Sequence, residues 1–122
     1  MPKTKRAAVV IRPADVAAEA EPANALVGKR LVRGDTHGPD ISVTWISIDG
    51  RHKRLVSRQS DRVYYIVSGA GRFELGDAAP VAVAAGEIVF IPRDVDYALE
   101  GRMTYLVMNG PAFRPGADEY LE

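Results

Sequence analysis

The side chains that could carry chemistry in this sequence are chiefly arginines and tyrosines. The chain has no cysteine and two histidines, His37 and His52, which excludes disulfides, thiolate metal sites, cysteine nucleophiles and sites built on several imidazoles. Arg62, Tyr64 and Ile66 alternate along one run, so their side chains share one face of a strand. Arginine binds carboxylate or phosphate through paired hydrogen bonds, and a tyrosine hydroxyl can donate to an oxyanion or exchange a proton. These residues therefore indicate a site for an oxygen-rich ligand.

Two other candidate motifs give weaker predictions. None of the serines Ser47, Ser57, Ser60 and Ser68 has a histidine at the spacing of a hydrolase triad. The run from Ser68 to Gly71 is rich in glycine, but it lies between two predicted strands and leads into no helix. We therefore expect a hairpin there rather than a phosphate-binding loop.

Size and charge limit the classes of protein to which the chain can belong. It has 122 residues, with 16 Lys and Arg against 16 Asp and Glu, which suits one domain and gives no support for nucleic-acid binding. Lys3, Lys5 and Arg6 form a small cationic cluster, which we interpret as a solvated tail. No apolar run approaches the roughly 20 residues that cross a bilayer, and no signal peptide is recognisable. We expect a cytoplasmic protein that binds neither nucleic acid nor membranes.

Short strands must position the candidate residues. The sequence after residue 25 consists of β-branched and aromatic runs separated by glycine, proline and aspartate, which predicts an all-β sandwich or barrel. We predict strands at residues 26–32, 41–48, 54–58, 62–67, 71–75, 81–84, 88–91, 97–99 and 103–108. Turns are predicted at residues 49–50, 69–71, 76–77, 85–86 and 92–94. Residues 13–24 have room for one or two helical turns.

The spacing of glycine and proline resembles that of the cupin superfamily over residues 41–113. The first cupin motif is matched by Gly50, Val56, Arg58, Arg62 and Gly69, and the second by Gly86, Pro92 and Tyr97. The resemblance implies a double-stranded β-helix, or jelly-roll barrel, preceded by a short strand and helical turn and followed by a C-terminal tail. We expect one domain, with an N-terminal arm and edge strands (1–40), a barrel core (41–113) and a tail (114–122).

The resemblance also identifies the residues at the positions where cupins usually carry their metal ligands. Cupins usually bind a divalent metal through three histidines and a glutamate. The corresponding positions here hold Val56, Arg58, Arg62 and Tyr97. Valine has no donor atom and guanidinium groups repel a cation, so we expect no metal cofactor unless a partner subunit supplies ligands. His52 is expected in the turn just after Gly50, and His37 in a loop.

The inward face of the barrel implied by the resemblance carries Arg58 and Tyr97 together with Arg62 and Tyr64. An unpaired guanidinium inside a barrel costs several kcal/mol, so each must meet a carboxylate, carbonyls, water or an anionic ligand. Asp61, Asp94 and Asp96 are close enough in sequence to supply a partner. If none does, the cavity is a site for an anion.

A purely structural interpretation of these residues stays open. Val56 and Tyr64 could simply fill the core, and Arg58 could extend its guanidinium to the barrel mouth. Trp45 could form an apolar wall of the cavity or pack in the core. The phase of its strand is not fixed, so either Trp45 or its neighbours Thr44 and Ile46 could face inward.

The sequence thus predicts a metal-independent cupin that binds a small, oxygen-rich, anionic organic molecule in its barrel. The candidate catalytic residues are Tyr97, Arg62 and Tyr64, and the candidate ligand-binding residues are Arg58, Val56 and Trp45. If the protein is an enzyme, we expect isomerisation, elimination or cyclisation, with Tyr97 exchanging the proton. The alternatives are a non-catalytic ligand-binding, sensor or accessory cupin and a structural domain with a filled barrel. The resemblance further implies a homodimer, with residues 7–11 and 26–32 covering sheet edges.

Overall fold

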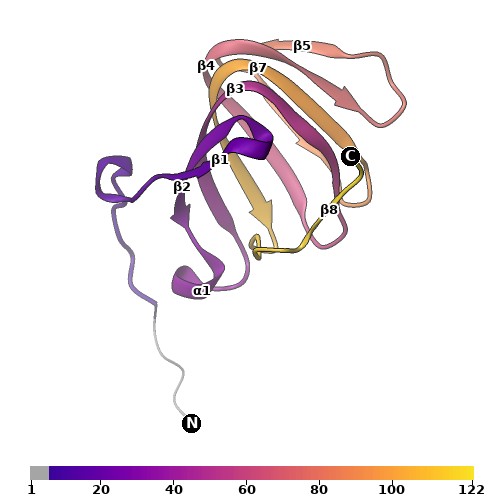
Figure 1. Cartoon of the computed structure of the whole chain (residues 1–122). Coiled ribbons are helices and arrows are strands. Elements are labelled where there is room, and N and C mark those ends of the chain that lie inside the picture. Colours follow the sequence, from indigo (N-terminus) through magenta and orange to yellow (C-terminus); the bar gives the residue numbers. More distant parts are fainter. Residues whose placement is uncertain (1–5) are drawn as a thin grey trace.

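The computed structural model describes residues 6–122 and shows long antiparallel strands that arch over one another (Figure 1). Lys3 and Lys5 of the predicted tail lie outside the described residues. The elements are η1 (Pro13–Asp15), β1 (Glu19–Glu21), η2 (Pro22–Asn24), β2 (Leu26–Val32), α1 (Gly34–His37), β3 (Ser42–Ser57), β4 (Asp61–Leu75), β5 (Val81–Ala84), β6 (Ile88–Ile91), β7 (Tyr97–Gly110) and β8 (Asp118–Tyr120). The predicted all-β, jelly-roll-like fold is confirmed. None of the helices in residues 6–122 is long and apolar enough to cross a membrane.

The strands pair antiparallel in the order β1-β2-β3-β7-β4-β5, while β6 also pairs with β4 and β8 also pairs with β3. The longest ladders join β7 to β3 on one side and to β4 on the other. Because side chains alternate along each strand, one face of these ladders points into the barrel and the other points outward.

Three of the strands are longer than predicted. The runs predicted as separate strands at 41–48 and 54–58 form the single strand β3, and those at 62–67 and 71–75 form β4. The runs at 97–99 and 103–108 likewise form β7. The turns predicted at residues 49–50 and 69–71 are therefore wrong, because the chain bends at these glycines without leaving the sheet.

A row of glycines explains how the three long strands bend. Gly50 on β3 pairs with Gly101 on β7, which pairs in turn with Gly71 on β4. Gly50 and Gly101 have φ angles of 136° and 147°, which residues with a Cβ rarely adopt. A Cβ added to Gly101 would lie 2.5 Å from the Cα of Gly71. We call the bend at Gly50, Gly101 and Gly71 the glycine crease, and it needs residues without side chains.

The core of the barrel consists of aliphatic and aromatic side chains from the inward faces. Ile66, Phe73, Leu99 and Tyr105 are fully buried. Tyr64 packs against both Phe73 and Tyr105, with ring centroids 5.1 Å apart in each pair. This packing fixes the ring of Tyr64, so the position of its hydroxyl is also fixed.

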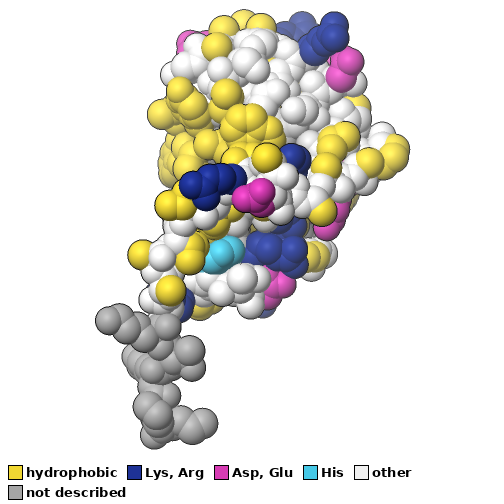
Figure 2. All heavy atoms as spheres, turned by 90° about the vertical axis from the view of Figure 1, so that its left-hand side faces the viewer, with side chains coloured by type: hydrophobic (Ala, Val, Ile, Leu, Met, Phe, Trp, Pro, Cys, Tyr) yellow, Lys and Arg dark blue, Asp and Glu magenta, His cyan; other side chains and the backbone are white. Residues whose placement is uncertain are grey.

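The outer face of the same strands carries a second apolar row. Trp45 on β3, Leu106 on β7, Tyr65 on β4 and Ile88 on β6 are register partners across four strands. Ile88 is 65% exposed, and Phe90 beside it is 60% exposed. The side of the molecule that carries β1 and β2 also shows hydrophobic side chains, with basic and acidic groups between them (Figure 2).

Candidate functional site

A cavity of about 430 Å³ lies inside the barrel. Its wall is formed by the inward faces of β2, β3, β4 and β7, together with β1 and the C-terminal segment that includes β8. The apolar part of the wall comes from Leu26, Ile46, Val107, Phe113 and Pro115, and the polar part from Arg30, Thr44, His52, Arg62, Tyr64, Tyr105, Asn109, Asp118 and Tyr120. The segment predicted as a tail therefore contributes to the cavity itself.

The guanidinium of Arg62 is the most buried charge on this wall, with 4% of the residue exposed. Its Nη1 donates to the hydroxyl of Tyr97 at 2.8 Å, and its Nη2 donates to the carboxylate of Asp118. Burial alone lowers the pKa of Arg62, but attraction to Tyr97, Tyr64 and Asp118 outweighs burial and raises it. Arg62 therefore stays charged and is neutralised within the chain.

The carboxylate that meets Arg62 is not one of those expected from the sequence. Asp61 accepts from Arg93 on the surface, Asp94 pairs with Arg58, and Asp96 pairs with Arg54. Asp118 reaches Arg62 because β8 pairs with β3, with Asp118 opposite Ser57. The expectation of an anion site rested on a barrel without an internal carboxylate, so the structure removes that reason for it.

Two tyrosine hydroxyls continue the hydrogen-bond chain from Arg62. The hydroxyls of Tyr64 and Tyr97 lie 2.6 Å apart, and both side chains are buried. Because a guanidinium can only donate, the oxygen of Tyr97 accepts from Arg62, which leaves its own hydrogen free to bond to Tyr64. Burial raises the pKa of both tyrosines, so both are neutral at physiological pH. Tyr64 forms part of the cavity wall, whereas Tyr97 lies behind it.

His52 lines the cavity instead of lying in a turn. It belongs to the middle of β3, is 8% exposed, and stacks on Tyr120 with ring centroids 6.1 Å apart. Its Nδ1 lies 2.8 Å from the backbone oxygen of Lys53, which can only accept, so Nδ1 carries the proton. Burial lowers the pKa of His52, so the ring is neutral and its Nε2 carries a lone pair at neutral pH. This is the state required of a general base.

The remaining predicted ligand-binding residues are not on the cavity wall. Arg58 is exposed and pairs with Asp94 and Glu119 at the surface, so its predicted inward placement is wrong. Val56 is 1% exposed and packs within the protein. Trp45 pairs with Leu106 in the outward row, whereas Thr44 and Ile46 line the cavity, which settles the phase of this strand.

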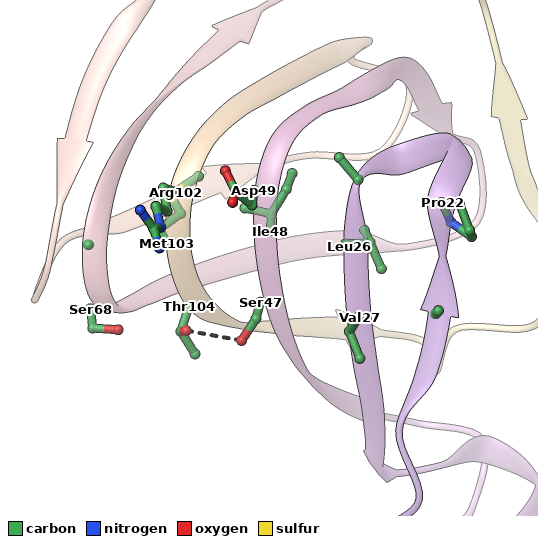
Figure 3. A pocket seen from close by; sticks show the side chains of 13 residues that line it. Pro22, Leu26, Val27, Ser47, Ile48, Asp49, Ser68, Arg102, Met103 and Thr104 are labelled. Atoms are coloured by element: carbon green, nitrogen blue, oxygen red, sulfur yellow. Dashed lines mark hydrogen bonds between the residues drawn. The ribbon is translucent and has the colours of Figure 1, made fainter.

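A second hollow, of about 600 Å³, lies on the outer surface near the glycine row (Figure 3). Leu26 and Val27 of β2 border it, and Ser47 on β3 is hydrogen-bonded to Thr104 on β7 at 3.1 Å. It is shallow, and its lining is mostly apolar or small. The inner cavity gathers more titratable groups and hydrogen-bonding side chains, so we place the candidate site there.

Comparison with solved structures identifies the fold. The chain superposes on a histidine-to-glutamine variant of Streptomyces Pac13 with uridine (TM-score 0.81, 18% identity, 95% of this chain and 92% of that one). It also superposes on KdgF from Halomonas sp. (TM-score 0.75, 16% identity, 89% and 97%) and on the polyketide cyclase RemF from Streptomyces resistomycificus (TM-score 0.76, 18% identity, 95% and 87%). This chain has the cupin fold. No protein-family profile and no curated protein sequence matches it.

The side chains at the usual cupin ligand positions do not fit a metal ion. Val56 has no donor atom, Arg58 lies at the surface, and Arg62 is already bonded to Tyr97 and Asp118. Within residues 6–122, no group of three or more His, Cys, Asp or Glu side chains is arranged to hold a metal. These positions therefore do not form the usual cupin metal site, and the cavity wall instead carries imidazole, phenol, amide, guanidinium and carboxylate groups.

Proposed function

We propose that this chain is a metal-independent cupin enzyme that binds a small, oxygen-rich organic molecule in the barrel cavity and catalyses an elimination on it. The observation that carries the proposal is the pairing of two groups on one cavity wall. One is the neutral imidazole of His52, and the other is the hydroxyl of Tyr64, linked through Tyr97 to a buried guanidinium. Together they supply a base and an acid without any cofactor.

The ligand that suits this wall is neutral rather than anionic. Three carboxylates line the cavity, those of Glu19, Glu21 and Asp118, against the two guanidiniums of Arg30 and Arg62. Arg62 is already neutralised by Asp118. Hydroxyl and carbonyl groups on the ligand would meet the remaining donors and acceptors without adding a buried charge.

The proposed step is loss of water from a hydroxyl group located β to a carbonyl. The Nε2 atom of His52 takes the proton from the carbon next to the carbonyl, and the electron pair of that C–H bond forms the new C=C bond. The C–O bond to the hydroxyl breaks, and Tyr64 gives its proton to the leaving oxygen, which departs as water. The Arg62–Tyr97 chain stabilises the oxygen of Tyr64 as it loses its proton, since a charge-assisted donor lies at the far end. The proton on His52 then returns to Tyr64, directly or through water.

The structural neighbours support this class of chemistry. Pac13 is described as a nucleoside dehydratase, and its solved structures with uridine include a histidine-to-glutamine variant and two tyrosine-to-phenylalanine variants. RemF is described as a polyketide cyclase. Dehydration and cyclisation both need positioned acids and bases, which the cavity of this chain also provides.

The experiment is turnover of β-hydroxy carbonyl compounds, derived from sugars and nucleosides, followed by the ultraviolet absorbance of the conjugated product. We expect His52→Gln and Tyr64→Phe to lower kcat by 100-fold or more. The matched controls His37→Gln and Tyr65→Phe, which change residues outside the cavity, should leave kcat unchanged. Saturable binding without turnover of any compound would instead support a non-catalytic ligand-binding cupin.

A further inference from the structure

Asn109 occupies a central place on the cavity wall that the proposed chemistry does not use. It lies near the end of β7, between register partners Ser42 on β3 and Arg62 on β4, and it is 4% exposed. The hydroxyl of Ser42 already accepts from the backbone N–H of Phe113 at 2.8 Å. The barrel thus presents a buried carboxamide beside a buried guanidinium.

The side-chain oxygen of Asn109 is buried and has no hydrogen-bond partner among the described residues. The Nε of Arg62 is likewise buried without a partner. Buried polar groups are almost always hydrogen-bonded, because desolvation without a bond is costly. Two unpartnered groups on neighbouring strands of one cavity indicate that a bound molecule completes them.

We infer that Asn109 and the Nε of Arg62 form a subsite for the N–H and C=O edge of a cyclic amide or imide, as found in a pyrimidine base. A carboxamide offers one donor side and one acceptor side in a plane, which an amide edge matches with two hydrogen bonds. The Nε–H of Arg62 adds a second donor for a carbonyl oxygen. A single hydroxyl lacks this rigid pairing of donor and acceptor. The inference rests on the proposed function, because it names the part of the ligand that this wall holds.

The binding test uses the full chain with uridine, 3-methyluridine and ribose as probes, measured by calorimetry or NMR titration. The methyl group replaces the imide N–H, and ribose lacks the base altogether. We expect uridine to bind at least tenfold more tightly than 3-methyluridine, and Asn109→Leu to abolish that difference. Equal binding of uridine and 3-methyluridine by the wild-type chain would overturn the inference.

The stability test does not depend on the ligand. Asn24 is the matched control, since it is 3% exposed but its side chain bonds to the backbone N–H of Lys53 at 3.0 Å and to the hydroxyl of Tyr120 at 3.2 Å. We expect Asn24→Leu to lower the thermal midpoint by several degrees, whereas Asn109→Leu keeps or raises it. A similar loss in both variants would show that Asn109 already has a structural partner, which contradicts the inference.

The outcomes separate the two proposals. If sugars and β-hydroxy carbonyl compounds bind the cavity but an imide edge confers no preference, the proposed function stands and the Asn109 subsite is wrong. If no probe of any kind binds, the proposed function fails and the subsite fails with it.

Discussion

The hydroxyls of Tyr64 and Tyr97 lie 2.6 Å apart, with Tyr64 on the cavity wall and Tyr97 between it and the guanidinium of Arg62. Sequence spacing favours Tyr97 as the proton-exchanging residue. The geometry instead makes Tyr64 the group that meets a ligand and Tyr97 the residue that positions and polarises it. The two tyrosines are thus expected to respond differently to substitution.

Removing each hydroxyl should separate these roles. Tyr64→Phe should lower kcat by 100-fold or more, because it removes the proton donor. Tyr97→Phe should lower kcat by about tenfold, in the range of one hydrogen bond of about 1–1.5 kcal/mol, because Tyr64 keeps its own proton. The initial rates of these variants are compared with that of Tyr65→Phe, on the outer face. An equal loss in the Tyr64 and Tyr65 variants would contradict the assignment.

The ion pair of Arg62 with Asp118 should stabilise the fold. Side-chain exposure is 5% for Arg62 and 14% for Asp118. Asp118→Asn leaves a buried guanidinium without its counter-charge, which typically lowers the free energy of unfolding by about 3–5 kcal/mol. Asp94→Asn breaks a pair whose side chains are 54% and 61% exposed, and such pairs contribute about 0–1 kcal/mol. Urea denaturation measures the free energy of unfolding of both variants. If Asp118→Asn lowers it as little as Asp94→Asn does, Asp118 is not needed to neutralise Arg62.

His52 should make stability depend on pH. Burial lowers its pKa in the folded state below the ordinary value of 6.5, so the unfolded chain binds this proton more readily. The contribution of the neutral His52 side chain to the stability of the fold is therefore fully present above pH 6.5, and it is lost as the pH falls toward the lowered pKa. Urea denaturation measures the free energy of unfolding at pH 7.5 and at pH 5.5. The fall between the two pH values should be smaller for His52→Gln than for wild type, and the His37→Gln variant should resemble wild type. A pH dependence unchanged in His52→Gln would contradict a buried neutral imidazole.

The glycine crease should not tolerate a side chain. In Gly101→Ala the added Cβ would lie 2.5 Å from the Cα of Gly71 and 2.6 Å from the backbone oxygen of Ala70, so backbone must move. We expect the thermal midpoint to fall by 10 °C or more, or the protein to fail to fold. Gly28→Ala is the control, because the nearest contact of its Cβ, at 3.6 Å to Ile46, is ordinary. Equal midpoints for the two variants would show that the crease does not constrain the fold.

The sequence predicts a homodimer with residues 7–11 and 26–32 at the sheet edges, but β2 is already paired with β1 and β3 within the chain. We therefore expect the chain to pair through the outward apolar row instead. Ile88 and Phe90 are largely exposed there and adjoin Tyr65 and Leu106, and antiparallel sheets bury such faces against one another. Light scattering after size-exclusion chromatography should give twice the chain mass for wild type and the chain mass for Phe90→Lys. A monomeric wild type at 100 μM, the loading concentration, would rule this pairing out.

The inward face of β4 could be predicted from the sequence because alternation is a local property. Arg62, Tyr64 and Ile66 share a face in the structure as they do in the pattern. The bends could not be predicted, since a glycine with positive φ serves a turn and a crease equally well. One usable signal was present for His52. If the strand is taken to continue through Gly50, alternation places His52 on the same face as Ile48.

Asp118 could not be predicted as the partner of Arg62. The two residues are 56 positions apart, and their meeting depends on the pairing of β8 with β3. A three-residue strand such as β8 carries no periodic pattern that would reveal its partner. Carboxylates near Arg62 in sequence are therefore poor guides to the barrel interior, because Asp61 and Asp94 pair with surface arginines instead.

Side-chain NMR during ligand titration tests most directly whether the barrel cavity is the functional site. The probes are uridine, ribose and a β-hydroxy carbonyl sugar derivative, added to the full chain labelled with ¹⁵N. We predict that at least one probe shifts the Nε2 signal of His52 and the amide signals of Asn109 in a saturable manner. The indole signal of Trp45, the single tryptophan, should stay in place because its ring lies in the outward row. Saturable shifts confined to Trp45 and the outer face, or none with any probe, would contradict a functional cavity.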